Sequence, residues 1–184
     1  LAAIIMLAAC NQKYTITPDE VVGKREQAQL HPHSKWISVV DAPVVTDTVY
    51  DGSRAADGAN WFMTSITPKK QIRKAVWVTT ALGVYDLFVN GNRVGKEVLK
   101  PGYTDYAKTK YAFAYDITDA LDTKAGAGNV FSAQVTPGWW GDKICTPHKH
   151  DGMVGKKCAF RGVIELTYAD GSKKYHGTDL ENWK

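Results

Sequence analysis

The sequence predicts an all-β fold, a jelly-roll-like sandwich of antiparallel strands, and three observations lead to it. Short runs rich in Val, Ile, Thr and aromatic residues recur from Trp36 to the end of the chain. Clusters of Gly, Pro, Asn and Asp separate these runs. Several runs alternate with period two, with Ala75, Trp77 and Thr79 on one face of their strand. Many short strands with turns between them are typical of a sandwich.

Seven runs are expected to form strands, and they are KWISVV, NWFMTSIT, KAVWVTTAL, YDLFVNG, YAFAYDI, NVFSAQVT and RGVIELTYADG. The pair Asn90-Gly91 predicts a two-residue hairpin, because both central residues of such a turn need positive φ. We expect Leu87–Val89 to pair with Arg93–Gly95 across it. Asp170-Gly171 predicts a second hairpin of the same kind, and DITDAL can form at most one helical turn, with Asp116 or Thr118 as its cap.

The stretch from Leu82 to Tyr106 is expected to be scaffold with at most a binding edge. Its alternation places Val84, Leu87 or Phe88, and Val89 where they can fill the core of a sandwich, while Asp86 and Lys96 can face water.

The first ten residues, LAAIIMLAAC, are interpreted as the tail of a secretory signal peptide. The run is too short to span a bilayer, which takes about 20 apolar residues. LAAC resembles the lipobox of bacterial lipoproteins, so Cys10 is the expected lipid attachment site; the alternative is an ordinary core cysteine in a buried strand or helix. We therefore expect a fragment of a longer protein that is secreted across the inner membrane and lipid-anchored, in the periplasm or at the outer-membrane surface of a bacterium.

The chain then divides into a linker, residues 11–35, and a sandwich domain, residues 36–184. The linker contains TPDEVVGKREQAQL, a predicted short helix in which Thr17 is the cap and Pro18 the first helical residue. His31 and His33 flank a proline and could hold a metal, although two histidines in a loop are more often solvated. The net charge is +4, with Lys and Arg scattered among nineteen acids, which argues against nucleic acid as a partner.

An ordered set of motifs carries a family resemblance. The hairpin VNGNRVG is followed by LKPGYTDY, then YDIT with a leucine, GWW, and finally YADGS, TD and a tryptophan. From about Trp36 onward the chain resembles the N-terminal β-sandwich domain of bacterial α-L-rhamnosidases. The segment GWWGDKICTPHKHDGMVGKKC departs from the family's Gly- and Arg-rich loop, which puts contact residues in doubt and not the fold.

The resemblance implies that the whole protein releases terminal L-rhamnose from glycans. In the family a separate, downstream helical toroid carries the catalytic carboxylates, and none of its motifs occurs here. We therefore expect no catalytic residue and no cofactor in this chain, with rhamnose-containing glycans and the downstream catalytic domain as its partners. The alternative is a non-enzymatic surface glycan-binding or adhesion lipoprotein built on the same sandwich.

Sugar binding is expected of aromatic residues with polar neighbours, because sugars stack their C–H faces on rings while polar groups bind the hydroxyls. Trp139 and Trp140 beside Asp142 offer one such platform, and Tyr103, Asp105 and Tyr106 offer another. The alternative is a structural spacer in which Trp139 packs inward and Tyr103 covers the end of a sheet.

With Cys10 assigned to lipid, two cysteines remain, Cys145 and Cys158. In an oxidising compartment an even remainder predicts a disulfide, which would close a loop of about a dozen residues and add roughly 3 kcal/mol of stability. A metal site formed by Cys145, His148, His150 and Cys158 is the rival, although their spacing matches no common zinc module. Free thiols are the third alternative.

Overall fold

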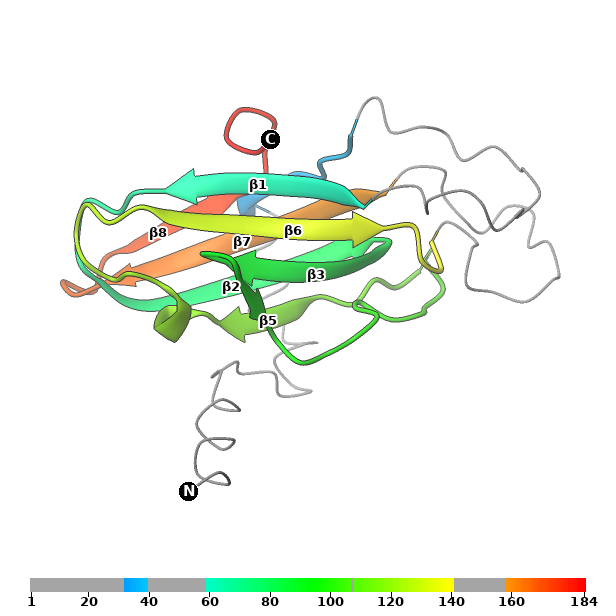
Figure 1. The fold of residues 1–184 in the computed structure, drawn as a ribbon, viewed down its shortest axis with the longest axis horizontal. Helices are drawn as coiled ribbons and strands as arrows, with labels where there is room; N and C mark the ends of the chain where they lie inside the picture. Colours follow the sequence, from blue (N-terminus) through cyan, green and yellow to red (C-terminus); the bar gives the residue numbers. More distant parts are fainter. Residues whose placement is uncertain (1–31, 40–58, 107, 141–157) are drawn as a thin grey trace, which may run out of the picture.

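The computed structural model describes residues 32–39, 59–106, 108–140 and 158–184, which form a sandwich of two four-stranded antiparallel sheets (Figure 1). The first sheet has the strand order β1-β6-β3-β4, and the second has the order β5-β2-β7-β8. The elements are β1 (Asn60–Ile66), β2 (Ile72–Leu82), β3 (Val84–Val89), β4 (Asn92–Val94), β5 (Phe113–Asp116), the 3₁₀ turn η1 (Thr118–Ala120), β6 (Asn129–Thr136), β7 (Ala159–Tyr168) and β8 (Lys173–Gly177). The predicted all-β sandwich is confirmed. Among the described residues, no helix has the length and apolar character needed to cross a membrane.

The core lies between the two sheets and is centred on Trp77 of β2, whose side chain is fully buried. Its ring makes edge contacts with Phe131 of β6 and Phe160 of β7, at centroid distances of 5.7 and 6.4 Å. Trp183 packs against the rings of Trp77 and Phe160, at centroid distances of 6.3 and 5.7 Å. Because the inner faces of both sheets are apolar and aromatic, their burial supplies the main driving force for folding.

Strand β3 corrects one expectation about the core. Its inward residues are Tyr85, Leu87 and Val89, while Val84 and Phe88 are half-buried on the other face. The prediction for Val84 was therefore wrong, because strict two-residue alternation gives Tyr85 the inward position. A tyrosine is tolerated there because its hydroxyl hydrogen-bonds that of Thr79, at 3.0 Å.

The hairpin at Asn90-Gly91 is confirmed, with φ of 50° and 81° at the two residues. The partner strand was predicted one residue too late, since Leu87–Val89 pairs with Asn92–Val94. A two-residue loop leaves Asn92 directly opposite Val89.

The second hairpin joins β7 to β8 but has a three-residue loop. The carbonyl of Tyr168 accepts from the N–H of Gly171, and the N–H of Tyr168 donates to the carbonyl of Ser172, both at 2.9 Å. Gly171 has positive φ and Asp170 does not, so this is a turn followed by a left-handed residue, and not the predicted Asn-Gly type.

The single helical turn predicted in DITDAL is confirmed as η1, but the predicted cap is wrong, because Ile117 is the N-cap residue and it makes no side-chain capping hydrogen bond. The carboxylate of Asp116 accepts from the N–H and the hydroxyl of Thr118, at 3.1 and 2.6 Å. KWISVV does not form a strand in residues 35–39, where Ile37 alone makes an isolated bridge, to Phe160. The predicted helix in residues 17–30 lies outside the described residues.

Candidate functional site

Four aromatic residues singled out from the sequence come together in what we call the aromatic cluster, made of Tyr103, Tyr106, Trp139 and Trp140. Tyr103 lies 6.5 Å from Trp139 and 6.2 Å from Tyr106, and Tyr106 lies 5.4 Å from Trp140, all measured between ring centroids. All three contacts are edge-to-face, a favourable arrangement for aromatic pairs. The two platforms expected separately are therefore one surface.

Pairing of β3 with β6 explains how the two parts of the cluster meet. Trp139 and Trp140 follow β6, whose last residue, Thr136, lies opposite Val84 at the start of β3. The loop that carries Tyr103 is attached to the same strand, because the N–H of Tyr85 donates to the carbonyl of Lys100 at 2.9 Å. Both loops thus lie beside the first residues of β3, Val84 and Tyr85.

The turn before the tryptophans packs closely on β3. Gly138 has φ of +50°, and a Cβ built there would lie 2.3 Å from Cγ2 of Val84. A residue with a side chain would have to push this turn away from the strand. Gly138 therefore helps to set where Trp139 and Trp140 lie.

The members of the cluster differ in exposure, and this suggests different roles. Tyr103 is 56% exposed, the two tryptophans are half-buried, and Tyr106 is 6% exposed. The hydroxyl of Tyr106 donates to the carbonyl of Gly102 at 3.3 Å, so this ring is held on the protein. Tyr103 presents the accessible ring surface, and the other rings support it.

Asp105 lies between the two tyrosines and shapes the loop. Its carbonyl accepts from the N–H groups of Lys108 and Thr109, at 2.9 and 2.8 Å. Its carboxylate forms an ion pair with Lys108 at 3.0 Å and remains 40% exposed. The loop is closed further by the Thr104 hydroxyl, which donates to the carbonyl of Thr109 at 2.6 Å. An exposed ring and an accessible carboxylate thus share one ordered loop.

Most of the other predicted site residues are not placed. Cys10, Asp142, Cys145 and the two histidines of the proposed metal site, His148 and His150, lie outside the described residues. Cys158 is buried directly before β7, where burial raises the pKa of its thiol. The disulfide with Cys145 and its metal-site rival stay predictions. Within the described ranges, no group of three or more His, Cys, Asp or Glu side chains is arranged to hold a metal ion.

Sequence reasoning missed a buried lysine beneath the loop of the cluster. Lys100 is 1% exposed, and its ammonium donates to the carbonyl of Val94 at 3.3 Å. The ammonium lies 3.8 Å from a carboxylate oxygen of Asp86, and 5.4 and 5.1 Å from the ring centroids of Tyr85 and Tyr115. Burial lowers the pKa of Lys100 to about 8, although the charge of Asp86 opposes this. A lysine before Pro-Gly reads as an exposed loop residue, so no sequence pattern signals this burial.

Three acidic residues in the described part of the chain, Asp86, Asp105 and Asp116, have structural partners. Asp86 accepts from the guanidinium of Arg93 at 2.7 Å, and that guanidinium also donates to the carbonyls of Gly95 and Glu97. These contacts hold the end of the first hairpin. Asp105 shapes its loop and Asp116 holds η1, as described above.

Comparison with known proteins shows the family to which this chain belongs. The sequence model of the α-L-rhamnosidase N-terminal domain matches residues 70–184. The chain belongs to this family.

This rhamnosidase N-terminal domain is similar to a part of several larger α-L-rhamnosidases. The α-L-rhamnosidase of Streptomyces avermitilis is 37% identical over 109 residues, which make up 58% of this chain and 10% of that protein. The crystal structure of the Streptomyces avermitilis enzyme complexed with L-rhamnose matches with a TM-score of 0.59 and 32% identity, over 69% of this chain and 12% of that one. The native α-L-rhamnosidase from Aspergillus terreus matches with a TM-score of 0.65 and 26% identity, over 92% of this chain and 17% of that one. The chain thus spans about a tenth to a sixth of the lengths of these relatives.

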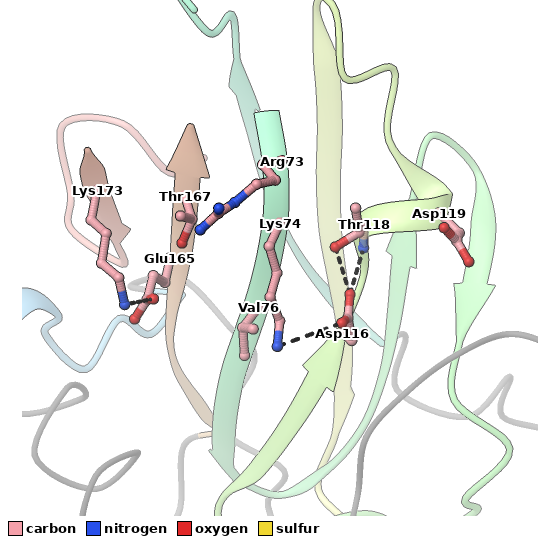
Figure 2. A pocket seen from close by; sticks show the side chains of 9 residues that line it. All are labelled: Arg73, Lys74, Val76, Asp116, Thr118, Asp119, Glu165, Thr167 and Lys173. Carbon is pink, nitrogen blue, oxygen red and sulfur yellow. Dashed lines mark hydrogen bonds and ion pairs between the residues drawn. The ribbon is translucent and has the colours of Figure 1, made fainter. Parts of the chain in front are cut away.

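The rhamnosidase N-terminal domain has a second feature, a groove of about 550 Å³ on the outer face of the second sheet (Figure 2). Nine residues line it, and they are Arg73, Lys74, Val76, Asp116, Thr118, Asp119, Glu165, Thr167 and Lys173. Val76 forms part of its floor, with Asp116 opposite on β5 and Glu165 opposite on β7. Asp116 and Thr118 belong to the motif YDIT, but none of the nine residues was predicted to bind a ligand.

Proposed function

We propose that this chain contains the accessory carbohydrate-binding domain of an α-L-rhamnosidase-type glycoside hydrolase, and that the aromatic cluster binds L-rhamnose. The observation that carries the proposal is the meeting of both predicted platforms in one cluster with an exposed ring, that of Tyr103, beside the accessible carboxylate of Asp105. The Streptomyces avermitilis relative, crystallised with L-rhamnose, supports this choice of sugar.

The chemistry of the cluster suits a deoxy sugar. L-Rhamnose has a methyl group and C–H faces that can lie on Tyr103 and against the edge of Trp139. Its hydroxyls can donate to the carboxylate of Asp105 and accept from Lys108, which is almost fully exposed. A monosaccharide offers few atoms and much polar surface to desolvate, so the affinity is expected to be weak.

In the longer protein, we propose that this domain positions rhamnose-containing glycans for a catalytic domain elsewhere in the polypeptide, which cleaves terminal L-rhamnose. The domain itself supplies no catalytic carboxylate under this proposal. Cys10 would carry the lipid that anchors the secreted protein to a bacterial membrane. The anchor would keep the glycan-binding surface close to that membrane, in the periplasm or at the outer-membrane surface.

Calorimetry of the 184-residue chain with L-rhamnose tests the proposal. We expect millimolar-range binding, on the order of −4 kcal/mol, that Tyr103→Ala or Trp139→Ala reduces at least several-fold. Tyr111→Ala is the matched control, because Tyr111 is 42% exposed but is not in the cluster. Rhamnose binding that survives both cluster substitutions would refute the assignment. The chain should not hydrolyse a chromogenic α-L-rhamnoside, and turnover lost in Asp86→Asn or Asp105→Asn would overturn the accessory role.

A further inference from the structure

The groove on the second sheet owes its charge to an irregularity in β2. Ile72 lies opposite Tyr168 and Lys74 lies opposite Thr167, so Arg73 is an extra residue in β2. Regular alternation would turn either Arg73 or Lys74 toward the core. The bulge instead leaves both side chains exposed between the buried Ile72 and Ala75. Bulges of this kind re-aim side chains and are common beside binding sites.

Some charged residues around the groove form ion pairs with each other, and one does not. Glu165, which is 5% exposed, accepts from the ammonium of Lys173 at 2.5 Å. Lys74 lies 3.8 Å from the carboxylate of Asp116. Arg73 has no hydrogen bond or ion pair with any of the described residues, and Figure 2 shows it extending from β2 toward Thr167 on β7. The groove therefore has one guanidinium whose donors are unused.

We propose that this groove binds a glycan residue that bears a carboxylate, a uronic acid. The planar fork of Arg73 matches a carboxylate, to which it can donate two parallel hydrogen bonds. The hydroxyls of the sugar ring can meet the carboxylate of Asp116 and the hydroxyl of Thr167. The apolar face of the ring can rest on Val76 in the floor.

The balance of charge argues for a singly charged polyol over a polyanion. Three cations line the groove, Arg73, Lys74 and Lys173, and three acids line it too, Asp116, Asp119 and Glu165. A phosphate or an oligosulfate would bring its further charge against these acids, which costs energy at short range. The same acids are good acceptors for the hydroxyls of a sugar.

The groove and the aromatic cluster lie at opposite ends of the sandwich, so they form separate sites. Figure 1 shows η1 and the start of β2 at one end and the end of β6, which leads to Trp139, at the other. β2 alone has 11 residues, which at about 3.3 Å each span roughly 35 Å. Substitutions at one site should therefore leave binding at the other unchanged.

Titration of the 184-residue chain with methyl β-D-glucuronide and methyl β-D-glucoside, followed by NMR, tests the proposal. We expect the glucuronide to bind about tenfold more tightly than the glucoside, a ratio of the size expected for one charge-assisted contact. Arg73→Gln should abolish this preference, and added salt should weaken it. Lys174→Gln is the matched control, because Lys174 is next to Lys173 on β8 but points to the other face of the strand.

Three results would overturn the proposal. The first is equal affinity for both glycosides. The second is an unchanged preference in Arg73→Gln when its urea-unfolding midpoint shows that it is folded. The third is competition by inorganic phosphate that is as strong as that by the glucuronide, which would indicate a general anion site. Tyr103→Ala, which should remove L-rhamnose binding, should leave glucuronide binding intact, so the failure of one site is distinguishable from the failure of the other.

Discussion

Raising the pH from 7 to 9.5 should stabilise the folded domain through Lys100. The ordinary pKa of a lysine is 10.5, and burial lowers that of Lys100 to about 8 in the folded state. Between these two values the unfolded chain binds more protons at this group than the folded chain does. The free energy of unfolding therefore rises with pH across this interval, and the stabilisation is lost as the pH falls toward 8 and below.

The size of the effect follows from the same two pKa values. The difference between 10.5 and about 8, at about 1.36 kcal/mol for each pH unit, sets a limit of about 3 kcal/mol. At pH 9.5 the unfolded lysine is still mostly protonated, so about 2 kcal/mol of the gain is realised between pH 7 and 9.5. Because Lys100 is only 1% exposed, solvent screening reduces this little.

Other groups act in the opposite direction at high pH. Burial raises the pKa values of Tyr85 and Tyr115, so these phenols ionise more readily in the unfolded chain, and their contribution to stability falls as the pH passes their ordinary values. The gain from Lys100 should therefore reverse near pH 10. A matched variant separates the two effects, because both proteins contain the tyrosines.

Urea unfolding of the native sequence and of Lys100→Met, at intervals from pH 7 to 9.5, measures the difference directly. Methionine keeps the length of the side chain without the charge. Relative to the variant, the native chain should gain about 2 kcal/mol over this range. If the free energies of unfolding of the two proteins change in parallel with pH, the inference that the protonated form of Lys100 destabilises the folded state is refuted.

Four further outcomes are expected. Gly91→Ala should cost about 1–2 kcal/mol in denaturant unfolding, through its φ of +81° alone, because its new Cβ would contact nothing; an unchanged midpoint would contradict this. Gly138→Ala should cost about 2–3 kcal/mol and weaken L-rhamnose binding, since its Cβ would collide with β3; full binding in this variant would show that the turn does not position the tryptophans. Thiol titration of the oxidised protein should find neither Cys145 nor Cys158 free, whereas stoichiometric zinc removable by a chelator would favour the metal site. Metabolic labelling with a palmitate analogue should disappear in Cys10→Ala, and unchanged membrane association of that variant would count against the anchor.

The parts of the fold that were predictable depend on local chemistry. Asn90-Gly91 specifies its turn because few other pairs accept positive φ at both positions. The inward position of Tyr85 was missed although alternation with Leu87 and Val89 implies it, because a buried tyrosine needs a hydroxyl partner, and that partner, Thr79, lies on another strand. A pattern of apolar residues contains no information about such partners.

In the candidate site, too, the residue types were predictable from the sequence, but the contacts between distant segments were not. The residue types in the aromatic cluster were read from the sequence, but their union depends on the pairing of β3 with β6, which places Thr136 opposite Val84. The groove was missed, although the doublet Arg73-Lys74 inside a strand pattern contains a signal. Two consecutive charged residues between inward-facing apolar ones break the two-residue period, and a bulge restores it.

The contacts of Trp183 and Lys184 determine when the domain can complete folding during its synthesis. Lys184 exchanges two backbone hydrogen bonds with Met63 at the free edge of β1, and Trp183 fills the core beside Trp77. Synthesis proceeds from the N-terminus, so β1 leaves the ribosome long before the residues that cover its edge. Until Trp183 emerges, the nascent chain has an incomplete core and an unpaired strand edge, both of which favour misassociation. This domain should therefore depend on chaperones during translation more than a sandwich closed by neighbouring strands.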